Sequence, residues 1–176
     1  MAYTFTEQTI GLPVLSAIIS VASAGLLNSG QFPCGTIARA QDPTNGQGEF
    51  MLLPGVASNE VGAVCVFNPR AKTTTRVTTS MTFTGAPVAV SMTGNTSTSA
   101  LSWYQIEGAA TVKKAAIKIS PRVTLYVSAT AGRVTSTALS GVNLVGMTSG
   151  NTSTVASTTS TVVVIMDRSA LRGGAT

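Results

Sequence analysis

Apolar and polar residues alternate along most of the chain from residue 73 onward, which is the pattern of half-buried β-strands. The run at 162–166, Val-Val-Val-Ile-Met, is apolar at every position and predicts a central strand. Turn residues separate these runs at intervals of about 8–12 residues, as in an all-β sandwich or jelly-roll-like domain. Further strands are expected from residue 73 and at 48–55, 88–92, 100–107, 110–119, 123–129, 134–139 and 142–147.

Local signals refine this pattern. The sequence Asp42-Pro43-Thr44-Asn45-Gly46 predicts a tight turn, because Asp can cap its own backbone and Asn-Gly tolerates left-handed conformations. The pentapeptide Gly-Asn-Thr-Ser-Thr occurs at 94–98 and again at 150–154, which indicates two similar loops. A helix remains an alternative at 14–27 and at the alanine-rich segment 109–118.

The chain is uncharged from Gln8 to Ala38, which suggests an extended, apolar N-terminal arm (residues 1–34) before a single β-rich domain (35–176). A membrane span or signal peptide is the alternative, but Gly and Pro interrupt the apolar run and the chain opens without basic residues. An apolar arm needs cover from the domain or from neighbouring subunits, so it points to an assembly.

Composition argues against an enzyme. Only 10% of residues are charged and 44% are hydrophobic, which excludes intrinsic disorder. There is no histidine, so the commonest general base and zinc ligand are missing. The six acidic residues are scattered, and the sequence has no phosphate-binding glycine motif. We therefore expect no catalytic site, no metal and no cofactor.

Two cysteines, Cys34 and Cys65, are fewer than a secreted disulfide scaffold usually carries. Cys65 lies in an apolar run, where a thiol serves as a small buried group. We expect both to be reduced, although a Cys34–Cys65 bridge stays possible.

The net charge of +5 could reflect an anionic partner, but basic residues approach a cluster only at Lys113, Lys114, Lys118 and Arg122. A solvated strand face is the simpler interpretation of that cluster.

Trp103 and Tyr104 are adjacent. As an interface pair they would form a binding hot spot. The favoured interpretation places Trp103 in the core and Tyr104 at a rim with its hydroxyl hydrated.

Several short motifs resemble the small virion proteins of tailed bacteriophages that decorate or cement the capsid. They span about residues 35–135. They are Gly-Thr-Ile-Ala-Arg-Ala at 35–40 followed by Asp42-Pro43, Gly-Gln-Gly-Glu-Phe at 46–50 followed by Leu53 and Gly55-Val56, Trp-Tyr-Gln-Ile-Glu-Gly at 103–108, and Thr-Ala-Gly-Arg at 130–133.

The resemblance implies a β-rich, non-enzymatic protein that binds the exterior of the expanded head and holds neighbouring major capsid subunits together. It implies assembly in the host cytoplasm and a symmetric oligomer, which we expect to be a homodimer or homotrimer. We expect no nucleic-acid or membrane partner. The expected contact elements are the arm, the loop around 42–50 and two basic residues. The candidate contact residues are Tyr3, Phe5, Leu12, Val14, Ile18, Arg39, Asp42, Glu49, Phe50 and Arg70.

Two other functions compete with this one. Loops rich in Ser, Thr and Asn are compatible with an adhesin or tail-fibre-type receptor-binding module, although few aromatic residues are available to stack on sugars. A nucleic-acid-binding β-barrel rests on the net charge alone, and it predicts DNA affinity that falls steeply with salt.

Overall fold

The protein is all-β, as the alternating pattern predicts. The computed structural model describes residues 3–6, 13–20, 32–68, 70–81, 85–139 and 142–173. Within these ranges there are twelve strands and no helix, so no described segment is a helix able to cross a membrane. Neither segment with a helical alternative forms one there, since β2 lies in the first and part of β8 in the second.

The strands join in one antiparallel sheet with the order β1-β3-β4-β8-β7-β12-β11-β9-β10, to which β2, β5 and β6 attach at the side. Their bounds are β1 (Thr4–Phe5), β2 (Ile18–Ser20), β3 (Ile37–Asp42), β4 (Gly46–Pro54), β5 (Val64–Asn68), β6 (Thr73–Arg76), β7 (Ala86–Ser91), β8 (Ala100–Lys113), β9 (Thr124–Val127), β10 (Val134–Thr135), β11 (Val142–Ser149) and β12 (Thr161–Gly173).

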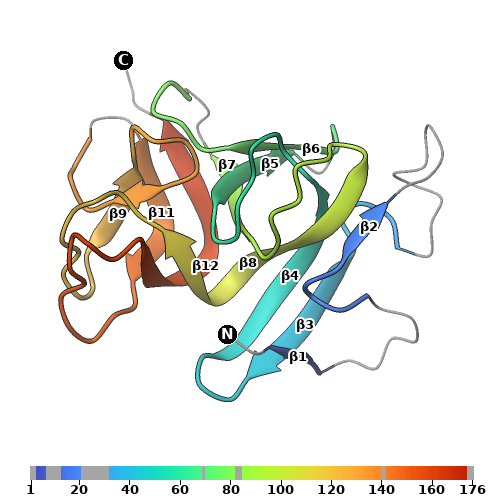
Figure 1. Cartoon of the computed structure of the whole chain (residues 1–176), viewed down its shortest axis with the longest axis horizontal. Helices are drawn as coiled ribbons and strands as arrows, with labels where there is room; N and C mark the ends of the chain where they lie inside the picture. Colours follow the sequence, from blue (N-terminus) through green and yellow to red (C-terminus); the bar gives the residue numbers. More distant parts are fainter. Residues whose placement is uncertain are drawn as a thin grey trace.

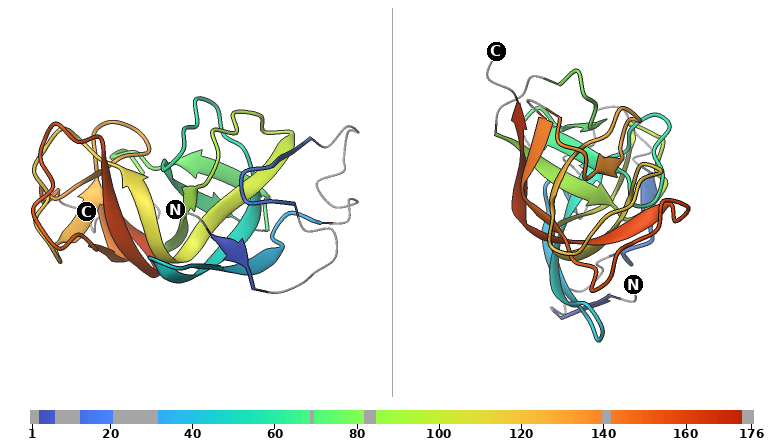
Figure 2. Two further views of the ribbon diagram at one scale, coloured as in Figure 1. Left: turned by 60° about the horizontal axis from the view of Figure 1, so that its bottom comes forward. Right: turned by 90° about the vertical axis from the view of Figure 1, so that its left-hand side faces the viewer.

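Strand β8 connects the two ends of the molecule (Figure 1). One edge of β8 pairs with β4, from Gly48 opposite Gly108 to Pro54 opposite Leu101. The other edge pairs in turn with β2, β7 and β12. The β1–β4 region therefore attaches along the first part of β8 and β12 along its last part, and Figure 2 shows the β1–β4 and β9–β12 regions at opposite ends of the molecule.

Gly108 explains why β8 is one strand and not the two predicted at 100–107 and 110–119. Its φ of +94° belongs to the left-handed region, where glycine is favoured. A Cβ at this position would overlap the Gln47 carbonyl oxygen. The strand therefore turns without ending, and it stops at Lys113, beyond which Ile119 makes only an isolated bridge to Val155.

Other predicted boundaries also move. The strand expected from residue 73 ends at Arg76, because the ladder with β5 is interrupted at Val77. Its N–H still donates to Val64 O of β5, but its carbonyl accepts from Gly132 N and the Val64 N–H donates to Gly132 O. The predicted central strand at 162–166 is confirmed as part of β12, but Ile165 is 47% exposed, so only one face is fully covered. Strand β3 (Ile37–Asp42) was not predicted, since no strand was expected before the turn at 42–46.

The tight turn predicted at 42–46 is confirmed. The Asp42 carboxylate accepts hydrogen bonds from the backbone N–H groups of Thr44 and Asn45, both at 2.8 Å. Gly46 has a φ of +76°, and it pairs with Asp42 to close the β3–β4 hairpin.

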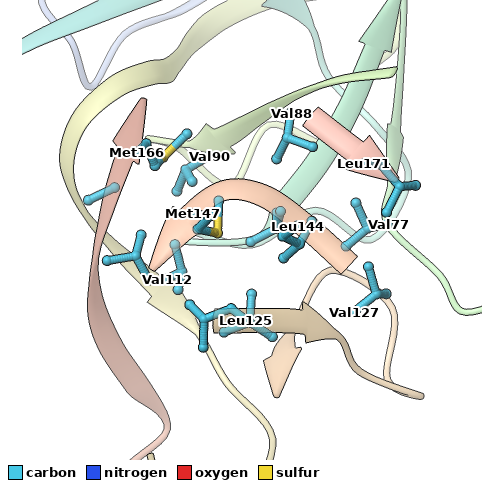
Figure 3. Packing of buried hydrophobic residues seen from close by; sticks show 14 of the residues in the cluster. Val77, Val88, Val90, Val112, Leu125, Val127, Leu144, Met147, Met166 and Leu171 are labelled. Atoms are coloured by element: carbon cyan, nitrogen blue, oxygen red, sulfur yellow. The ribbon is translucent and has the colours of Figure 1, made fainter. Parts of the chain in front are cut away.

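Three hydrophobic clusters fill the molecule. The largest lies among β5, β7, β9, β11, β12 and the end of β8 (Figure 3). The other two lie on opposite faces of the paired strands β4 and β8, one around Trp103 and one around Tyr104. Because β8 lines all three, its residues from Ala100 to Ile106 are buried at every position. This is a sandwich-like arrangement in which β8 has no solvent face between Ala100 and Ile106.

Substitution of two glycines tests whether the bend in β8 is tight, with Gly108 at the bend and Gly46 in the β3–β4 turn as the control. Gly46 and Gly108 both have positive φ, but a Cβ would meet nothing within 4 Å at Gly46 and would overlap backbone at Gly108. We expect Gly46→Ala to lower the free energy of unfolding by about 1 kcal/mol, which is the left-handed penalty alone. Gly108→Ala should cost at least about 3 kcal/mol, because steric overlap adds to it. Urea denaturation of both variants measures the difference, and equal losses would contradict the tight-bend interpretation.

Candidate functional site

The described parts of the N-terminal arm lie on the protein's own sheet. β1 pairs with β3, and β2 pairs with β8. The Tyr3 ring packs edge-on against Phe50 with centroids 5.1 Å apart, and its hydroxyl donates to Ala109 O at 2.6 Å. The Phe5 ring lies 5.7 Å from Trp103. Three of the predicted contact residues, Tyr3, Phe5 and Phe50, thus belong to an internal cluster.

The core position of Trp103 is confirmed. It is fully buried, and its indole N–H donates to Pro13 O at 3.0 Å. This bond fastens the segment 13–20 to the centre of the sheet.

The rim position predicted for Tyr104 is wrong. Tyr104 is fully buried on the opposite face of β8, because successive residues of a strand point to opposite sides and both sides are covered here. Its hydroxyl donates to Pro54 O and accepts from the Asn59 amide. Burial raises the pKa of the Tyr104 phenol.

The arm also presents apolar side chains to solvent. Val14 is 64% exposed and Ile18 is 52% exposed, whereas the next residue, Ile19, packs against the Trp103 cluster. The strand β2 is therefore anchored on one side and open on the other. Leu12, the remaining candidate from the arm, lies outside the described residues.

The structure brings Arg39 and Glu49 together at a cross-strand ion pair of 2.8 Å. Glu49 is also bound by Arg168, whose Nε lies 3.2 Å from Glu107 Oε2. Arg39, Glu49 and Glu107 line a small pocket of about 280 Å³ with Gln47 and Gly48. Sequence reasoning missed Arg168 and Glu107, since only the register of β4 against β8 places Glu107 opposite Glu49.

The remaining two candidates, Asp42 and Arg70, do not belong to this ion-pair group. Asp42 holds the turn between β3 and β4. Arg70 is an exposed residue of the β5–β6 turn, where its backbone N–H donates to Asn68 Oδ1.

The predicted basic strand face is only partly solvated. Lys114 is 1% exposed, and its ammonium group donates to Ile117 O at 2.7 Å and Ala115 O at 3.2 Å. Burial lowers the pKa of Lys114. Lys113 lies 3.5 Å from Glu60, and only Lys118 and Arg122 are exposed. The interpretation as one solvated face is therefore wrong for Lys114.

Both cysteines are free, as predicted. Cys65 is fully buried, and its burial raises the pKa of the thiol to about 12. Cys34 is half-buried at the margin of the same cluster, where burial also raises its thiol pKa.

The described residues contain no group of three His, Cys, Asp or Glu side chains placed to hold a metal ion.

Comparison with known proteins found no relative: no family model matches the chain, and neither curated proteins nor solved structures match it.

The two thiols should differ sharply in reactivity. With an aromatic disulfide reagent at pH 8, we expect about one thiol per chain to react in the native protein and two in denaturant, since burial shields Cys65 and suppresses its thiolate. A Cys34→Ser variant should then show almost no native reaction. Two rapidly reacting thiols in the native protein would contradict the burial of Cys65.

Proposed function

We propose that the chain is a virion structural protein, a decoration or cement protein that binds the outer capsid surface and stabilises contacts between major capsid subunits. One observation carries this proposal: an N-terminal segment is anchored to the sheet through Ile19 and Trp103 and presents Val14 and Ile18 to solvent. The motif resemblance at 35–133 points the same way. The role proposed is non-enzymatic and exterior to the head.

The anchored segment suits a contact surface for an energetic reason. Its backbone is already ordered by pairing with β8, so binding would not pay the full cost of ordering a free chain. Covering the exposed parts of Val14 and Ile18 would contribute about 1 kcal/mol each. Such modest contacts add up when a homodimer or homotrimer engages several subunits of a symmetric shell at once.

The arm itself is a poor target for deletion. Removing residues 2–25 would take away Tyr3, Phe5 and Pro13 O, which cover the Trp103 cluster, so loss of binding could follow from loss of folding. Substituting exposed side chains avoids this difficulty. Val61, which is 59% exposed just before β5, provides a matched apolar control away from the arm.

The test is co-sedimentation with expanded, undecorated heads of the same virus. We expect saturation at a simple ratio to the major capsid protein and greater resistance of the heads to heat. In a Val14→Ser, Ile18→Ser double variant, we expect an affinity about 30-fold lower, which corresponds to about 2 kcal/mol. Val61→Ser should bind like the unaltered protein.

Absence of co-sedimentation would discard the capsid role. If the protein then bound host cells without any capsid present, the adhesin or receptor-binding function would take its place. Binding that is equally weakened by Val61→Ser would contradict the assignment of the contact to the arm.

A further inference from the structure

All of the net charge resides in one part of the chain. Residues 108–166 contain five of the eleven basic residues and no acidic residue, whereas the remaining six basic residues are balanced by the six acidic ones. This segment builds the end of β8, all of β9, β10 and β11, and the start of β12. We call it the basic segment. The net value of +5 for the whole chain does not show that the charge is concentrated in this segment, which makes the β9–β11 end of the molecule cationic (Figure 1).

Most basic side chains of the basic segment already interact with carboxylate or carbonyl oxygens of the protein. Lys113 and Arg133 both lie within 4 Å of Glu60 carboxylate oxygens, at 3.5 and 3.6 Å. Lys114 is buried against carbonyl groups. Lys118 and Arg122 remain exposed, and neither forms an ion pair with any residue in the described ranges. These two side chains carry the available positive charge.

Arg122 differs from Lys118 because it lines a pocket of about 590 Å³ between the end of β11 and the loop 150–152. Its backbone is held in place: the Arg122 N–H donates to Ser149 O at 3.1 Å, and the Ser149 hydroxyl donates to Ser120 O at 2.8 Å. The Asn151 amide donates to Ile119 O at 3.3 Å on the other side of the loop. The pocket wall is therefore built by hydrogen bonds that do not involve the guanidinium group.

The pocket also has an apolar wall because residue 150 is glycine. A Cβ at Gly150 would lie 3.1 Å from Ile165 Cδ1 and 3.5 Å from Val163 Cγ1. With no side chain there, Ile165 stays 47% exposed and lines the pocket. The first copy of the repeated pentapeptide lacks this feature, since a Cβ at its Gly94 would meet only the Asn59 carbonyl oxygen, at 3.8 Å, and no apolar side chain.

We propose that this pocket binds a carboxylate carried on an aliphatic group, as presented by an acidic, aliphatic segment of a partner protein. The Arg122 guanidinium would bind the carboxylate, for which its planar fork is suited. Ile165 would contact the aliphatic part. A nucleic acid is a poorer fit, because among the described residues of the basic segment only Lys118 and Arg122 are exposed and outside an ion pair, and none of the described lining residues is aromatic and able to stack on a base.

This inference goes beyond the proposed capsid role, because the pocket can be tested with a small probe and no capsid. The probe is 3-methylbutanoate, and its neutral isostere 3-methylbutanamide is the control. NMR titration of the full chain should show saturable shifts of the Arg122 side-chain N–H and the Ile165 methyl groups. We expect binding of the amide to be at least about tenfold weaker.

Matched variants distinguish binding in the pocket from attraction by positive charge alone. Arg122→Gln and Lys118→Gln remove the same unit charge from the same connection, but only Arg122 lines the pocket. We expect at least about tenfold weaker binding of 3-methylbutanoate by Arg122→Gln and unchanged binding by Lys118→Gln. Gly150→Ala, which keeps Arg122 but places a methyl group against Ile165, should also weaken binding.

Three results would overturn the proposal: no saturable shift, equal affinity for the amide, or equal loss of affinity in Arg122→Gln and Lys118→Gln. Spectra of the folded variants without probe confirm that a loss is not due to unfolding. Failure here would leave the capsid co-sedimentation result untouched, since that contact is assigned to Val14 and Ile18.

Discussion

The structure depends on the burial of β8 on both faces. Trp103 packs against the N-terminal segments on one side, and Tyr104 packs beneath β5 and β7 on the other. Neither residue can move to solvent without opening a cluster, so the strand is fixed in register against β4. Gly108 then lets the same strand turn toward β12, where Val112 enters the largest cluster. One bend thereby joins three hydrophobic clusters through a single strand.

This arrangement has a consequence for binding. Val14 and Ile18 lie beside the first residues of β8, and the Arg122 pocket lies toward β11 and β12, at the other end of the sheet in Figure 1. The two surfaces differ in chemistry, since one is apolar and the other combines a cation with an apolar wall. A strand buried between two unlike surfaces would suit the bridging role proposed above, because flexibility between contacts would raise the entropic cost of bridging.

The sequence predicted the local features well and the long-range ones poorly. Alternation and turn chemistry identified β7, β11 and the Asp42 turn, because both act over a few residues. The predicted solvent contact of Tyr104 was wrong, since alternation assumes that one face of a strand is exposed to solvent and both faces are covered here. Sequence reasoning also failed at Gly108, where glycine was taken as a break. The ion pairs of Arg168 and the Arg122 pocket depend on strand register, which no local pattern reveals.

Native-state hydrogen exchange of the β8 backbone amides measures whether this strand couples the two ends of the sheet. If the strand joins the clusters into one cooperative unit, Tyr104 before the bend and Val112 after it should exchange with the same free energy, equal to that of global unfolding. A smaller opening free energy at Val112, with a weaker dependence on denaturant than that at Tyr104, would show that the β9–β12 end opens separately and would contradict the coupling through β8.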